Sequence, residues 1–210
     1  MTAPEPVAKR STPGARPPAP APGRRLVVVS GPSGVGKTTV CRAVAERLGV
    51  PISTSATTRP RRAGEVDGKD YYFIGEEEFR RRAAQGRFVE WAEIFGRLYG
   101  TPVEELDRAP NAGDILLLEI DVQGGIQIRK KFPEALAILL LPPDPQDLRS
   151  RLSTRGTEAP EEASRRVAKA QEEVRMARQA GCYDAEVVND RLDDAVRRVI
   201  ELVKTRRRQS

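Results

Sequence analysis

The stretch Gly31-Pro-Ser-Gly-Val-Gly-Lys-Thr38 decides the fold, because it matches GxxxxGK[ST], the pattern of a phosphate-binding loop. The apolar run Leu26–Val29 precedes it and predicts a buried strand, and residues 40–48 follow with apolar side chains at helical spacing. Backbone N–H groups of such a loop, and the start of the helix behind it, attract phosphate oxygens. Lys37 is placed to reach the outer phosphates and the Thr38 hydroxyl to ligate Mg²⁺. The sequence therefore predicts a nucleoside triphosphate site; a glycine-rich turn that binds nothing fits this combination poorly.

Length and composition indicate one substantial domain with room for insertions, in a chain of 210 residues. No apolar run reaches membrane-spanning length, and no apolar segment follows the basic residues of the N-terminus as a secretory signal would require. Cys41 and Cys182 lie far apart and the chain has no histidine, which argues against a protein zinc site. We expect a cytoplasmic protein in a reducing compartment, without a membrane partner.

The formal charge of +6 is unevenly distributed along the chain. Residues 1–25 carry a net charge of +4 and seven of the 17 prolines, which leaves +2 for the other residues. We therefore expect residues 1–24, rich in Pro, Ala and Arg, to be a disordered extension, and we do not expect a nucleic-acid partner. The basic run Arg206–Arg208 follows an amphipathic pattern and is better explained as the end of a helix.

Near-continuous apolar runs at 26–29, 115–120, 137–141 and 187–188 predict strands buried on both faces. With helical patterns between them, they predict an α/β fold with a central, mostly parallel sheet. We assign the core domain to residues 25–52, 106–144 and 181–208.

Two segments interrupt this core. Residues 53–105 are rich in Thr, Arg, Gly and aromatic residues and predict an inserted, mainly β module with one short helix from Glu76 to Gln85. Residues 145–180 are strongly charged and helical, with a helix start at Pro160. A helical lid and a static surface hairpin explain the second segment equally well from pattern alone.

The inserted module begins with a dense group of hydroxyls and guanidiniums at residues 53–62. A turn at Pro60 would aim Arg59 and Arg62 to the same side, where bidentate guanidiniums suit a phosphate dianion. A solvated basic loop is an equal alternative from these residues alone.

Taken together, several stretches resemble the guanylate kinases, over about Arg25 to Lys204. They are GPSGVGKTT at 31–39, SATTRPRR at 55–62, GEVDGKDYYF at 64–73, FVEWAE at 88–93, YGT at 99–101, LEIDVQG at 118–124, RLSTRGTE at 151–158 and VVND at 187–190. The resemblance implies a P-loop NTPase-type three-layer core, a GMP-binding insertion and an arginine-bearing helical lid. It also implies transfer of the γ-phosphate of ATP to GMP, which gives ADP and GDP.

The resemblance also implies roles in binding GMP. Glu90 stands at the guanine-reading position, where a carboxylate suits the N1–H and N2–H₂ donors, and Ser55 and Thr101 would donate toward O6. Adenine would be mismatched to this set. The GMP-binding residues implied are Ser55, Arg59, Arg62, Tyr71, Glu90, Tyr99, Thr101 and Asp121, of which Arg59, Arg62, Tyr71 and Tyr99 would hold the phosphate.

On the donor side, the implied ATP-binding residues are Gly31, Pro32, Ser33, Gly34, Val35, Gly36, Lys37, Thr38, Thr39 and, at the adenine end, Asn189. A turn after a strand explains Asn189 equally well. The implied catalytic residues are Lys37, Arg59 and the lid arginines Arg151, Arg155 and Arg166, which would neutralise charge on the transferred group.

Magnesium is the expected cofactor, with Thr38, Glu119 and Asp121 as ligands, partly through water. Glu119 and Asp121 are two residues apart, which puts them on one face if both lie in a strand. A buried pair of carboxylates capped by other groups is the alternative.

Two other functions are weighed against a guanylate kinase in purine nucleotide metabolism. One is a catalytically inactive guanylate-kinase-like module that binds phosphopeptides, which would have lost Lys37, Thr38 and the lid arginines. The other is a P-loop kinase for another nucleoside monophosphate. We expect ATP and GMP as substrates, dGMP as a further acceptor, and a monomer or weak homo-oligomer.

Overall fold

A parallel four-stranded sheet forms the centre of the molecule. The computed structural model describes residues 25–109, 114–144 and 160–208. The sheet consists of β1 (Arg25–Ser30), β6 (Ile115–Ile120), β7 (Leu136–Leu141) and β8 (Ala185–Val188), in the order β6-β1-β7-β8. Each neighbouring pair is parallel, with Val27 opposite Leu117 and Leu136. The prediction of an α/β fold with a mostly parallel sheet is confirmed.

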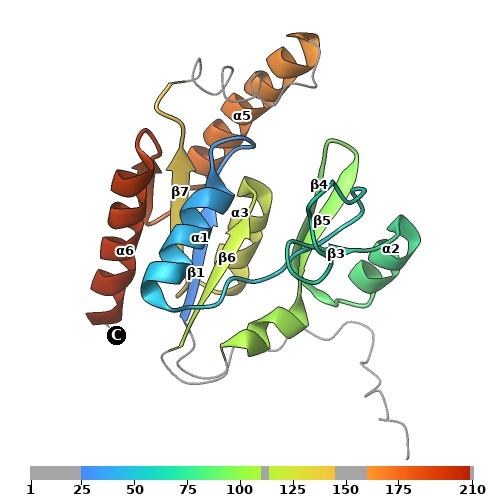
Figure 1. Ribbon diagram of the computed structural model, residues 1–210, viewed down its shortest axis with the longest axis horizontal. Coiled ribbons are helices and arrows are strands. Elements are labelled where there is room, and N and C mark those ends of the chain that lie inside the picture. The colour runs from blue at the N-terminus through green and yellow to red at the C-terminus, as the bar shows by residue number, and fades with distance from the viewer. Residues whose placement is uncertain (1–24, 110–113, 145–159, 209–210) are drawn as a thin grey trace, which may run out of the picture.

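Helices cover both faces of this sheet and make three layers (Figure 1). On one face, α1 (Lys37–Leu48) and α6 (Leu192–Arg208) pack against the β1 side chains Val27 and Val29. On the other, α3 (Val122–Lys131) packs against Leu26 and Val28. Helix α5 (Pro160–Ala180) packs beside α3, against the β7 side chains Leu139 and Leu141. Because both faces are covered, the strands read as continuous apolar runs.

The inserted segment builds a second, smaller sheet. Its elements are β2 (Ala56–Thr57), β3 (Tyr72–Phe73), α2 (Glu76–Ala84), β4 (Phe88–Ile94) and β5 (Arg97–Pro102), followed by a 3₁₀ helix, Val103–Arg108. The strand order is β3-β2-β5-β4, with antiparallel β2–β5 and β4–β5 pairs. Phe79 of α2 stacks on Phe88 of β4 with ring centroids 4.4 Å apart, and both side chains are buried. This small core holds the strands that carry the candidate acceptor site.

Several predicted boundaries compare closely with the observed ones. The short helix ends at Ala84 with Gln85 as its cap, and β7 begins one residue earlier than the apolar run suggested. The basic run at the C-terminus does complete α6. The N-terminal extension and residues 145–159 of the expected lid lie outside the described residues. Within the described ranges, no helix has the length and apolar character needed to cross a membrane.

The core should be sensitive to cavities beneath the site. Leu118 of β6 is fully buried in the cluster that supports α3, so we expect Leu118→Ala to cost about 2–5 kcal/mol of unfolding free energy. Leu192, at the start of α6, is 41 % exposed, and the matched change Leu192→Ala should cost less than about 0.5 kcal/mol. Urea unfolding of both variants measures the difference, and equal losses would contradict this assignment of the core.

Candidate active site

The phosphate-binding loop joins the end of β1 to the start of α1. Lys37, the first residue of α1, donates from Nζ to the carbonyl oxygens of Gly31 and Pro32, at 2.6 and 3.0 Å. Gly36 precedes the helix with φ of 95°, a left-handed conformation that favours glycine. A Cβ at Gly36 would also lie 2.6 Å from Nδ2 of Asn189. The loop therefore depends on glycine for both its backbone shape and the space beside it.

Asn189, the residue after β8 (Ala185–Val188), supports this loop. It is 6 % exposed, its Nδ2 donates to the Val35 carbonyl at 2.8 Å, and its backbone N–H donates to Leu141. The side chain therefore fixes the loop through a main-chain group. Its predicted contact with adenine stays a prediction.

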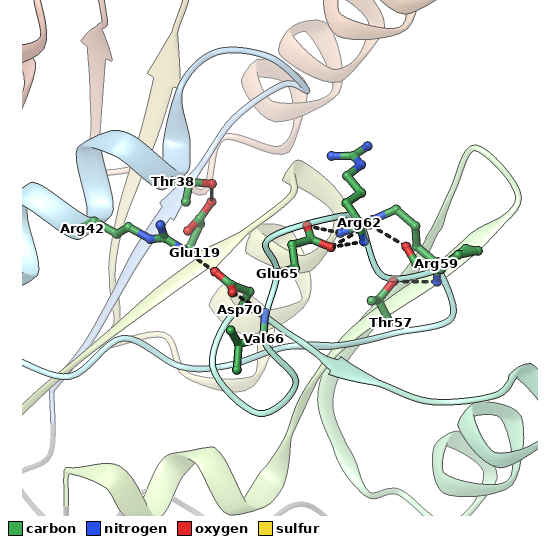
Figure 2. Close-up of polar contacts among 10 residues, drawn as sticks. Thr38, Arg42, Thr57, Arg59, Arg62, Glu65, Val66, Asp70 and Glu119 are labelled. Carbon is green, nitrogen blue, oxygen red and sulfur yellow. Dashed lines mark hydrogen bonds and ion pairs between the residues drawn. The ribbon is translucent and has the colours of Figure 1, made fainter. Parts of the chain in front are cut away.

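Thr38 and Glu119 bring two oxygens together beside the loop. Thr38 Oγ1 donates to Glu119 Oε1 at 2.5 Å, from the start of α1 to β6 (Figure 2). Burial raises the pKa of the Glu119 carboxyl, while the Thr38 hydrogen bond and nearby Lys37 oppose that shift. A hydroxyl and a carboxylate are suitable ligands for Mg²⁺, which usually keeps several waters and substrate phosphates as its other ligands. Within the described ranges, no group of three acidic, cysteine or histidine side chains forms a complete metal cage.

Asp121 differs from the sequence expectation. Strand β6 ends at Ile120, so Asp121 does not share a strand face with Glu119. It is the N-cap of α3, and its side chain accepts from the backbone N–H groups of Gln123 and Gly124. The prediction that both carboxylates lie on one strand face was therefore wrong, because a carboxylate before a helix satisfies free N–H groups there. Its proposed roles toward guanine and metal stay predictions.

The candidate base-reading residues do come together on the smaller sheet. Thr101 donates to Glu90 Oε1 from its hydroxyl, at 2.7 Å, and from its backbone N–H, at 3.0 Å. The Ser55 and Thr101 hydroxyls lie 3.5 Å apart. Glu90 is 2 % exposed, and burial, with the nearby charge of Asp121, raises the pKa of its carboxyl to about 7, against the opposing Thr101 hydrogen bonds.

Helix α3 holds the strand that carries Glu90. A Cβ on Gly124 would lie 2.5 Å from Glu90 Oε2, so the carboxylate fits against a position without a side chain. Gln127 completes the contact: its Nε2 donates to the Trp91 carbonyl at 2.8 Å, and its Oε1 accepts from the Trp91 N–H at 3.3 Å. Because β4 is an edge strand, this amide pairs with backbone groups that would otherwise lack a strand partner.

The candidate phosphate-holding residues form a second group. Arg59 makes a two-bond ion pair with Glu65, at 2.7 and 3.1 Å, and its guanidinium carbon lies 5.4 Å from the centre of the Tyr71 ring. Tyr99 meets Tyr71 edge-on, with centroids 6.0 Å apart. Burial raises the pKa of the Tyr71 phenol to about 12, so it remains a hydrogen-bond donor at neutral pH. The Arg62 side chain is exposed and extends away from its own loop (Figure 2).

A contact between helix α1 and the insertion lies between the Thr38–Glu119 pair and the Arg59–Glu65 pair (Figure 2). Arg42 of α1 pairs with Asp70 at 2.6 Å, and Asp70 also accepts from the Val66 N–H at 2.8 Å (Figure 2). This loop leads directly into Tyr71. The ion pair therefore ties the acceptor-side tyrosine to the helix that follows the phosphate-binding loop.

Sequence reasoning missed three residues that support the site, namely Glu65, Gln127 and Glu105. Glu105 is 4 % exposed and accepts from the Thr54 N–H at 2.6 Å and the Tyr72 hydroxyl at 2.8 Å. It braces the start of the insertion against its end. Glu65 lies in a motif that carries the resemblance, which is a usable signal, whereas Gln127 and Glu105 have none in the local pattern.

The lid arginines are only partly described. Arg151 and Arg155 lie outside the described residues, and Arg166 is part of α5, although its side chain is not described. Their roles stay predictions.

A parallel sheet with a GxxxxGK[ST] loop between its strand β1 and helix α1 defines a P-loop nucleotide-binding protein. The family model described as Guanylate kinase matches residues 23–206. The chain is 48 % identical over 172 residues to a guanylate kinase of Symbiobacterium thermophilum, covering 81 % of this chain and 80 % of that one. It is 44 % identical over 179 residues to a guanylate kinase of Caldanaerobacter subterraneus, covering 85 % of each. The chain belongs to the guanylate kinase family.

A solved structure agrees with this membership. The crystal structure of guanylate kinase from Anaplasma phagocytophilum superposes with a TM-score of 0.69 at 30 % sequence identity, covering 89 % of this chain and 87 % of that one. The resemblance found in the sequence motifs is confirmed for both the family and the fold.

The buried Glu90 predicts a pH dependence of folding. Its folded pKa of about 7 lies above the ordinary 4.5, so the native state holds a proton that the unfolded state has lost between those values. Stability should therefore fall as pH rises from 4.5 to 7, by on the order of 3 kcal/mol from this group.

Glu90→Gln isolates this effect, because it removes the titration and keeps the shape of the side chain. Wild type should lose unfolding free energy relative to Glu90→Gln as pH rises from 5 to 7, and the difference between the two proteins should stay constant well above pH 7. Urea unfolding measures both. Glu93→Gln, an exposed change on the same strand, should run parallel to wild type at every pH. Parallel curves for all three proteins would contradict the raised pKa of Glu90.

Proposed function

We propose that this member of the guanylate kinase family is an ATP:GMP phosphotransferase, which transfers the γ-phosphate of ATP to GMP and releases ADP and GDP. The observation that carries the proposal is the buried Glu90–Thr101 pair of the insertion, in a chain with an intact phosphate-binding loop. The loop alone would suit any nucleoside triphosphate, and the pair supports guanine as the acceptor base.

Guanine recognition would follow from one hydrogen-bond acceptor, the Glu90 carboxylate, and from nearby hydroxyl donors. Glu90 in its ionised form would accept from guanine N1–H and N2–H₂, and the Ser55 hydroxyl, 3.5 Å from that of Thr101, would donate toward O6. The Thr101 hydroxyl donates to Glu90 in the free protein and would turn from it to donate toward O6 as well. Adenine presents an acceptor at N1 and a donor at N6, which would leave the buried Glu90 without its two donors. A site built from buried polar groups discriminates against such a base by up to about 10⁴–10⁵-fold.

The GMP phosphate would be held by Arg59, Tyr71, Tyr99 and Arg62. Arg59 is already oriented by Glu65, and the two phenols meet edge-on beside it. Exposed Arg62 supplies a second guanidinium on a loop that closes over the phosphate. The bound phosphate is an anionic nucleophile, so the reaction needs no histidine base, and the chain contains none.

The donor half would hold ATP on the loop Gly31–Thr39. Lys37 then moves from the carbonyls of Gly31 and Pro32 to the outer phosphates, and Asn189 keeps the loop shape from behind. Thr38 and Glu119 would hold Mg²⁺, with Asp121 acting through water; when bound, the ion neutralises charge on the phosphate oxygens. Phosphoryl transfer is mainly positioning and charge neutralisation, which these residues supply.

The remaining assignments complete the proposal. Residues 53–105 act as the GMP-binding module on a core of 25–52, 106–144 and 181–208, and residues 145–180 act as the lid, with Arg151, Arg155 and Arg166 over the triphosphate. The enzyme would serve cytoplasmic purine nucleotide metabolism as a monomer or weak homo-oligomer and accept dGMP as well as GMP. The phosphopeptide-binding module and a kinase for another base have no observation in their favour.

A coupled assay with ATP and Mg²⁺ tests the activity directly. We expect turnover with GMP, slower or comparable turnover with dGMP, and rates with AMP and UMP lower by at least about a hundredfold. Turnover of AMP equal to that of GMP would overturn the base assignment. Absence of turnover with every acceptor would overturn the kinase assignment itself.

The Glu90→Gln variant tests the base-reading role on its own. An amide has one acceptor oxygen and turns its NH₂ group toward a guanine donor, so the KM for GMP should rise at least about tenfold. The KM for ATP should stay unchanged, because Glu90 belongs to the acceptor module. Steady-state kinetics of wild type, Glu90→Gln and the strand-matched control Glu93→Gln make the comparison. An unaltered KM for GMP in Glu90→Gln would remove Glu90 from the site.

A further inference from the structure

A buried carboxylate from α5 lies on the phosphate-binding loop and has no role in the reaction described above. Glu173 is 3 % exposed, and the backbone N–H of Ser33, in the middle of the loop, favours the ionised form of its carboxylate and lowers its pKa. Among the described residues, its Oε2 has no hydrogen-bond partner. One of the two carboxylate oxygens is therefore removed from water without a hydrogen bond that replaces its hydration, which costs free energy in a protein interior.

Packing of α5 explains why Glu173 stays in this position. The turn that follows Glu173 carries Val174, Met176 and Ala177. These side chains pack against Val122 of α3 and the β7 residues Leu139 and Leu141. In Figure 1, α5 passes beside the loop between β1 and α1. The apolar contacts fix the helix, and the helix in turn places Glu173 over the loop.

The charges around Glu173 resemble those around a bound phosphate. Lys37 lies close enough to favour its ionised form, as does Lys169, whereas Asp121 opposes it. Lys37 nevertheless donates to the carbonyls of Gly31 and Pro32. A carboxylate stabilised by a loop N–H group and by the loop lysine draws on the same donors that would bind a nucleotide phosphate.

We propose that Glu173 is a competitor built into the lid helix, which occupies the Ser33 N–H until the phosphates of a nucleotide displace it. Displacement separates two like charges and frees the middle of α5 from the loop, so nucleotide binding and the position of α5 are coupled. After transfer, return of Glu173 to Ser33 opposes retention of ADP. Glu173 is a positioning residue in this scheme and makes no contact with the transferred phosphorus.

The proposal rests on the proposed function and predicts a gain of affinity on mutation. Glu173→Gln keeps an acceptor for Ser33 and removes the charge, so ADP should bind roughly tenfold more tightly than to wild type. The neighbouring Glu172, which is exposed on the same helix, gives the matched control Glu172→Gln, expected to bind ADP as wild type does. Affinity for GMP should be unchanged in both variants, because the acceptor site lies on the insertion.

Isothermal titration with ADP, without added metal so that no cation screens the carboxylate, measures these affinities. Equal or weaker ADP binding by a folded Glu173→Gln protein would overturn the proposal, as would an equal gain in Glu172→Gln. Should Glu173→Gln not fold, Glu173→Asp withdraws the charge by one methylene and should give a smaller gain, and no gain would again overturn it. Wild-type activity toward GMP is measured separately, so failure of the kinase assignment is distinguishable from failure of this inference.

A pH series adds a readout that a purely structural role would not produce. Burial raises the pKa of Glu173, against Lys37, Lys169 and the Ser33 N–H and together with Asp121, so the carboxylate loses its charge as pH falls. The affinity ratio between Glu173→Gln and wild type should therefore approach one at acid pH and grow toward pH 8. The phosphates of ADP titrate equally in both proteins and cancel in the ratio. A ratio that is constant across this range would count against the competition.

Discussion

Three carboxylates withdrawn from water, two at the phosphate-binding loop and one on the insertion, constrain the rest of the site. Glu90, Glu119 and Glu173 each have a raised pKa whose largest cause is burial. Glu90 and Glu119 each accept a hydrogen bond from a threonine hydroxyl, and the Ser33 N–H favours the ionised form of Glu173. Burying a carboxylate costs several kcal/mol unless donors compensate for it, and here the donors are few. The apolar clusters of the three-layer core offset this cost. The same groups are the ones that substrates with donors, cations or competing anions would relieve.

The connection between the two sheets is built from unequal contacts. The Arg42–Asp70 pair joins side chains that are 62 % and 20 % exposed, so it is a surface ion pair worth at most about 1 kcal/mol. The contact of α3 with β4 is stronger, because Val89 belongs to the buried cluster beneath α3 and Gln127 pairs with both backbone groups of Trp91. The Lys131 ammonium also donates to the Val89 carbonyl. The insertion is therefore held firmly where Glu90 lies and weakly where Tyr71 lies.

Local patterns in the sequence were sufficient for the core and insufficient for the contacts between modules. The run Leu26–Val29 and the loop after it predicted β1, α1 and the parallel sheet, because burial on both faces leaves a continuous apolar signature. Asp121 was misplaced because period-two reasoning assumes that the strand continues, whereas an aspartate before Gln123 and Gly124 caps a helix. Glu173 and Gln127 gave no signal, since each is a polar residue in a polar helical segment. Their importance comes from partners more than 30 residues away, which no spacing rule encodes.

The position of Glu90 depends on the smaller sheet and on helix α3 of the core. The smaller sheet supplies Glu90 and Thr101, and Thr101 donates twice to the same oxygen, Oε1. The other oxygen, Oε2, faces α3 at Gly124, where any side chain would occupy its place. Gly124 thus leaves room for one carboxylate oxygen while Thr101 fixes the other, so the side chain is held in one orientation at a cost in burial. A residue with a pKa near 7 responds strongly to a ligand, because two donors from a base replace the water that burial has removed. The missing Cβ at Gly124 and the double donation from Thr101 therefore act together to orient the Glu90 carboxylate.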